Sequence, residues 1–117
     1  MLAILFATTV AFAQTAAPAA RPTALISYEE AVRCAGLTQA ASEMEGGESA
    51  NGKALFDAAL YWSLAAGQAA QASGKAATVA DADQNHARIT AVQQLNADNA
   101  DARADLQRCR ARTPDLG

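Results

Sequence analysis

Histidine, aromatic side chains and strand-like segments are scarce in this chain of 117 residues. Its one histidine is His86, and only 5% of its residues are aromatic. A histidine-rich metal site is therefore excluded, and a Cys-His or Ser-His catalytic pair would have to use His86. The motif C-x-x-C-H is absent, which excludes covalent haem of the c type. We expect no cofactor, no metal site and no catalytic activity.

A long apolar run occurs at the start of the chain and nowhere later. Residues 2–13 carry no charge and end in Ala11-Phe12-Ala13, the small-x-small pattern that signal peptidase accepts. The run is too short to cross a bilayer core, which takes ~20 residues. We therefore predict a signal peptide at 1–13, with export to the periplasm or the outside of the cell, although no Lys or Arg precedes the run.

The segment after the predicted cleavage site, 14–26, consists mainly of Ala, Pro and Thr, which indicates a flexible linker. A helical domain over 27–113 and a short tail over 114–117 follow. A domain of roughly 85 residues folds alone only marginally and is often helped by a disulfide. The two cysteines, Cys34 and Cys109, suit that need.

No segment alternates β-branched and polar residues as a strand would, and alanine makes up most of the apolar fraction, so an all-α fold is expected. Helix signals include Ser27 and Glu30 in capping-box spacing, and Gly46-Gly47 after an apolar stripe. The predicted helices are 27–45, 50–73, 78–96 and 99–112. They form a small antiparallel four-helix bundle made of two helical hairpins; stacked hairpins are an alternative packing.

The second predicted helix, 50–73, has polar side chains on one narrow stripe only. A helix with so wide an apolar surface is normally covered by more than one neighbour, so we expect it at the centre of the bundle. Most of the core is then expected to consist of Phe56, Leu60, Trp62 and Leu64. The apolar side of the third helix is expected to include Val79, Ile89 and Leu95.

The positions of the cysteines predict where the chain reverses. With 1.5 Å of rise per residue, a third helix continuing unbroken to Arg112 would place Cys109 ~35 Å from Cys34. A disulfide tolerates only about 7 Å between Cα atoms. Poor helix formers cluster at 96–101, and a reversal there brings the two cysteines to the same level. We predict a Cys34–Cys109 disulfide; two buried free thiols are the alternative if the chain is not exported.

Two motifs imitate binding loops. Gly47, Gly52 and Lys53 match G-x-x-x-x-G-K, but Ala54 replaces the Ser or Thr of a P-loop and a helix, not a strand, precedes it. The segment from Asp81 resembles the start of an EF-hand loop, but it lacks the required Gly and Glu. Both segments are interpreted as structural.

The chain has a net charge of −3, which gives no broad basic footprint for nucleic acid. Basic residues gather near the C-terminus, and Arg108 and Arg112 either complement the last helix dipole or contact a partner. Tyr61 falls in the polar stripe of its helix. It is therefore either a surface anchor for a partner or a ring lying over alanines.

These observations favour a small exported, periplasmic protein with a structural, interaction or envelope-stress role. The expected partner is another envelope protein, contacted through Tyr61, Arg108 and Arg112. The alternative is a carrier that binds a small apolar ligand in a site lined by Leu60, Trp62 and Leu64. An enzyme ranks third, because it would need His86 beside a free thiol.

Overall fold

A computed structural model describes residues 26–115, which form four helices and no strand. The helices are α1 (Tyr28–Glu45), α2 (Ala50–Ala72), α3 (Ala77–Asn96) and α4 (Ala100–Ala111), and each bound lies within one residue of the predicted one. The predicted signal peptide, nearly all of the predicted linker and the last two residues lie outside the described residues. The all-α, four-helix fold class is confirmed.

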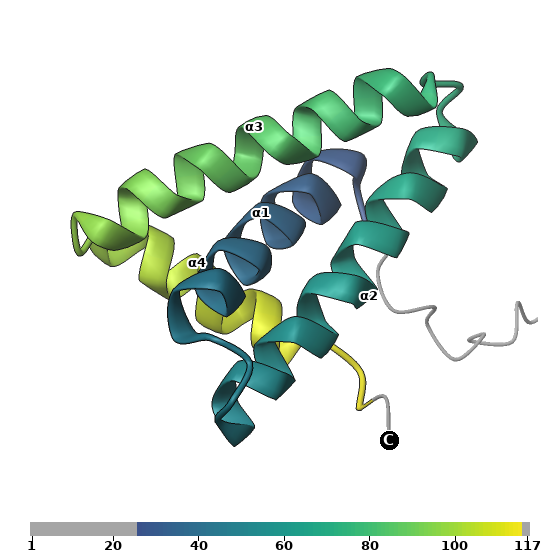
Figure 1. Cartoon of the computed structure of the whole chain (residues 1–117). Coiled ribbons are helices and arrows are strands. Elements are labelled where there is room, and N and C mark those ends of the chain that lie inside the picture. The colour runs from purple at the N-terminus through teal and green to yellow at the C-terminus, as the bar shows by residue number, and fades with distance from the viewer. Residues whose placement is uncertain (1–25, 116–117) are drawn as a thin grey trace, which may run out of the picture.

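The helices are arranged around α1 (Figure 1). α2 and α3 meet at a sharp turn and diverge from it, and α1 lies in the space between them, antiparallel to α2. α4 turns back from the far end of α3 and crosses the remaining side of α1. The chain therefore encloses its first helix with the three that follow.

Local hydrogen bonds explain where three of the helices begin. The side chains of Ser27, Ser49 and Asn99 each accept the backbone N–H three residues ahead, at 3.1, 3.0 and 2.9 Å. Such caps satisfy N–H groups that have no partner within the helix. α1 ends at Gly46, whose φ of 81° favours glycine and whose N–H donates to the Ser42 carbonyl.

The most enclosed helix is α1, so the prediction of the second helix at the centre is wrong. Eight of its 18 residues are buried: Ala31, Cys34, Ala35, Gly36, Leu37, Thr38, Ala40 and Ala41. Most of these side chains are small, and they allow the neighbouring helices to approach closely. At Gly36 a Cβ would lie 2.6 Å from the carbonyl carbon of Ala87, so the crossing of α1 and α3 requires glycine there.

The predicted core of α2 is correct only for Trp62, which is 0% exposed. Phe56, Leu60 and Leu64 are 55%, 49% and 68% exposed. Apart from Trp62, the buried side of α2 carries other residues: Leu55, Ala58, Ala59, Ala66 and Ala70. The prediction for α3 is wrong for Val79 and Ile89, which are exposed, and correct for Leu95, which is half-buried and packs against the core; the fully buried residues of α3 are Ala80 and Ala91. The alanine-rich faces are buried because their small side chains allow the helices to pack closely.

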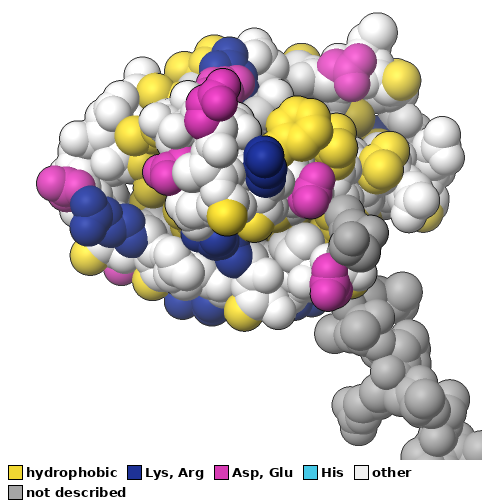
Figure 2. Space-filling view, turned by 60° about the horizontal axis from the view of Figure 1, so that its bottom comes forward, with side chains coloured by type: hydrophobic (Ala, Val, Ile, Leu, Met, Phe, Trp, Pro, Cys, Tyr) yellow, Lys and Arg dark blue, Asp and Glu magenta, His cyan; other side chains and the backbone are white. Residues whose placement is uncertain are grey.

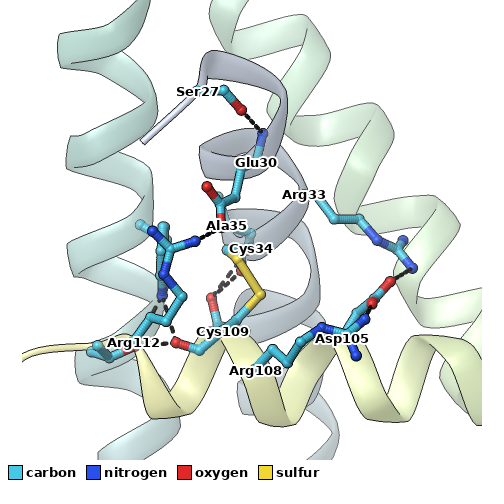
Figure 3. Close-up of a disulfide and its surroundings, with 12 residues drawn as sticks. Ser27, Glu30, Arg33, Cys34, Ala35, Asp105, Arg108, Cys109 and Arg112 are labelled. Atoms are coloured by element: carbon cyan, nitrogen blue, oxygen red, sulfur yellow. Dashed lines mark hydrogen bonds and ion pairs between the residues drawn. A yellow bond between two sulfur atoms is a disulfide. The ribbon is translucent and has the colours of Figure 1, made fainter. Parts of the chain in front are cut away.

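The predicted disulfide between Cys34 and Cys109 is present, with 5.5 Å between the Cα atoms. Figure 3 shows it at the point where α4 crosses α1 steeply, rather than running beside it. Two ion pairs flank the bridge: Arg112 with Glu30, and Arg33 with Asp105 at 3.3 Å. α4 is thus held to α1 mainly at one crossing.

Candidate functional site

Three large apolar side chains lie exposed along α2, and we call Phe56, Leu60 and Leu64 the α2 stripe. They are spaced four residues apart, which places them on one side of a helix with 3.6 residues per turn. Leu64 also borders a hollow of about 270 Å³ between α2 and α3. An apolar row of this kind at the surface of a small protein is typical of an interaction site.

The exposure of the stripe follows from helix geometry. Leu60 and Trp62 are separated by two residues, which corresponds to roughly 200° around the helix. When Trp62 points into the core, Leu60 must point away from it. The sequence did contain a signal of this, because the stripe is offset by one residue from the alanine-rich row of Leu55 and Ala59. Because both rows are hydrophobic, hydrophobicity alone does not predict which of them is buried.

The predicted partner-contact residues do not join this stripe. The ring of Tyr61 is half-buried and lies edge-on to Trp62, with 5.1 Å between the ring centroids. Arg112 pairs with Glu30, and its guanidinium lies 6.0 Å from the centre of the Trp62 ring. Arg108 is exposed and pairs with Asp105 one turn earlier on α4. Tyr61 and Arg112 therefore take part in packing around Trp62.

The predicted ligand-lining residues do not face a common cavity. Trp62 is fully buried, and its indole N–H donates to the Cys109 carbonyl at 3.2 Å and to the Thr113 hydroxyl at 2.9 Å. Leu60 and Leu64 face the solvent. The indole therefore links α2 to the end of α4.

The residues considered for catalysis and metal binding do not form a common site either. Both cysteine sulfurs are in the disulfide, so His86, which is exposed on α3, has no thiol to activate. Asp81 and Asp83 lie within α3 and not in a loop. Within residues 26–115 no three His, Cys, Asp or Glu side chains come together as metal ligands.

The segment that imitates a P-loop ends inside a helix. Gly52 lies in the first turn of α2, where its N–H donates to Ser49. None of the helices in the described range is sufficiently long and apolar to span a bilayer.

Tyr28 forms a polar contact between the start of α1 and α3. Its hydroxyl donates to a carboxylate oxygen of Asp83 at 2.7 Å, and the amino group of Lys75 lies 4.5 Å from the centre of its ring. Burial, and then the hydrogen bond and negative charge of Asp83, raise the pKa of Tyr28 to about 12. The phenol must therefore stay protonated for this contact to persist.

The raised pKa predicts a loss of stability at alkaline pH. Because the pKa of Tyr28 is about 12 in the folded protein and the ordinary pKa of tyrosine is 10.0, the stabilisation is complete below pH 10 and is lost as the pH rises towards 12. Unfolding by urea at about pH 8 and about pH 11 should show this loss in the wild type and a smaller one in Tyr28→Phe.

Ultraviolet absorbance of the Tyr61→Phe variant isolates the ionisation of Tyr28, since the chain has two tyrosines. A midpoint at the ordinary pH of 10.0 in the folded protein would contradict the prediction.

No protein-family model matches this chain, and no curated protein and no solved structure matches it either.

Proposed function

We propose that this protein is a small exported protein of the cell envelope, periplasmic or secreted, which acts by binding another protein and not as an enzyme. Its contact surface is the α2 stripe. The observation that carries the proposal is the exposure of Phe56, Leu60 and Leu64 in one row on a helix whose opposite side is packed against α1.

The spacing of the stripe indicates the kind of partner. Anchors at every fourth position of a helix are the pattern by which an amphipathic helix binds in an apolar groove. Lys53 lies one turn before Phe56, and Asp57 lies beside it, so the start of the row has polar neighbours of both charges. A polar rim around an apolar centre is typical of interfaces between proteins that also exist apart. The partner is therefore expected to present an apolar groove with a polar edge.

Two further observations support export. Residues 2–13 have the pattern of a signal peptide, and disulfides persist mainly in oxidising compartments such as the periplasm. Both observations support the envelope part of the proposal.

A photo-cross-linking amino acid at position 60, introduced in cells, tests the contact surface. We expect one defined adduct of higher mass, which disappears when Phe56→Gln and Leu64→Gln are added on either side. Because both side chains are exposed, the paired substitution should change the free energy of unfolding by less than about 1 kcal/mol.

The matched control uses two other exposed apolar side chains, Val79 and Ile89 on α3. The cross-linker at position 89 should give no such adduct, and Val79→Gln with Ile89→Gln should leave the adduct from position 60 intact. Equal adducts from positions 60 and 89 would contradict a specific surface. An adduct with the mass of two copies of this chain would contradict a separate partner.

A further inference from the structure

A second surface feature lies on the side of α4, at the junction of all four helices. It is a groove of about 490 Å³ that we call the α4 groove. Its apolar part consists of Ala41, Leu55, Leu95 and Leu106, one residue from each helix. Met44, which is half exposed, forms part of its wall. In Figure 2 hydrophobic side chains are visible in a hollow on the left, between basic and acidic groups.

Two guanidinium groups border this groove, those of Arg103 and Arg110. Arg110 donates to the side-chain carbonyl of Asn51 at 2.7 Å. Arg103 pairs with Asp98, but both side chains are more than half exposed. An ion pair in that setting contributes little and is readily exchanged for another anion.

The lining also contains one acidic side chain, Glu45. Its carboxylate accepts a hydrogen bond from the Ser49 hydroxyl at 3.2 Å, so it is bonded to the loop between α1 and α2. The lining itself therefore carries two positive charges and one negative charge, and Asp98, the exposed partner of Arg103, is not part of the lining. An occupant with an apolar body and one negative end would match this distribution.

We propose that the α4 groove binds an acyl chain that ends in a carboxylate, with the chain over the leucines and the carboxylate on Arg103 and Arg110. A guanidinium can donate two parallel hydrogen bonds to a carboxylate, which fixes the orientation of the ligand. The volume lies in the range of sites for small molecules. This inference goes beyond the proposed function, because the groove does not include the α2 stripe.

The lining favours an acyl chain over a peptide. Most of its residues have backbone carbonyl groups that are bonded within their helix, and in the last turns the carbonyl groups of Leu95 and Arg110 accept the N–H groups of Asp98 and Thr113. A peptide backbone over the leucines would leave its own N–H and C=O groups without partners, at a cost in free energy. A hydrocarbon chain has no such groups to satisfy.

Decanoate, used below its micelle concentration with the isotope-labelled full chain, tests this assignment by methyl NMR. We expect saturable shift changes in the methyl groups of Leu55, Leu95 and Leu106. The double substitution R103Q/R110Q should weaken the binding about tenfold or more, because it removes the charge-assisted hydrogen bonds. R108Q, on the same helix but outside the groove, should change the dissociation constant by less than about twofold.

A second pair of variants keeps the test valid if the arginine substitutions disturb α4. M44E places a negative charge on the exposed wall and should abolish the shift changes, whereas M44Q should preserve them; circular dichroism checks that both are folded. The α2 variant L60Q/L64Q should bind decanoate normally, so the two proposals can fail separately.

Three results would overturn the inference. One is the absence of saturable shifts with decanoate in the wild type. Another is equal binding of decyltrimethylammonium, which has the same chain and the opposite charge. The third is displacement of decanoate, at lower concentration, by a short peptide with leucines before its free carboxyl end, which would identify a peptide as the better occupant.

Discussion

Removal of the Cys34–Cys109 disulfide is expected to lower the free energy of unfolding by roughly 4 kcal/mol. The bridge joins residues 75 positions apart, and closing so long a loop removes much of the conformational entropy of the unfolded chain. A small domain has a total stability of only about 5–15 kcal/mol. The reduced protein should therefore be close to unfolding.

Release of α4 is the expected first step of that loss. Apart from the disulfide and the small core contact of Ala102 and Leu106, α4 is joined to α1 by ion pairs whose side chains are 30–39% exposed, and such pairs stabilise weakly. Thermal unfolding followed by circular dichroism, with and without reductant, measures the effect. The variant Cys34→Ala with Cys109→Ala should melt like the reduced wild type and should not respond to reductant. An unchanged melting curve after complete reduction, verified by a thiol assay, would refute the prediction.

Replacement of Trp62 by alanine is the second change with a large expected effect, a loss of about 3–5 kcal/mol. The side chain is fully buried at the contact of α1, α2 and α4, so its removal leaves a cavity. It also removes the indole N–H that donates to the Cys109 carbonyl and the Thr113 hydroxyl. Urea unfolding followed by circular dichroism measures the loss, because the variant has no tryptophan fluorescence.

The matched control is Leu60→Ala, two residues earlier on the same helix. Leu60 is about half exposed, so this substitution should cost less than about 1 kcal/mol. Equal losses in the two variants would mean that Leu60 lies in the core with Trp62, as its hydrophobic character alone had predicted. The ratio of the two effects is therefore a direct test of which side of α2 is buried.

The same comparison shows how far the candidate site could be predicted. The sequence predicts Phe56, Leu60 and Leu64 in the core, whereas the structure exposes all three. Hydrophobicity indicates that a side chain favours burial; it does not say whether enough helices are available to bury every apolar face. In this protein α1 is the central helix, and the outer side of α2 is exposed.

The four helices, their ends and the pairing of the cysteines can be predicted from the sequence alone. Helix ends depend on local interactions, such as the caps at Ser27 and Asn99 and the positive φ of Gly46. The cysteine pairing followed from the fixed rise of a helix and the turn before α4.

Which helix is central and which helix faces meet depends on packing between all four helices. Small residues such as Gly36 allow α1 to approach its neighbours closely, and the free energy of that packing depends on shape across several helices at once. The α4 groove has the same origin, because its leucines come from α2, α3 and α4, which only the folded chain brings together.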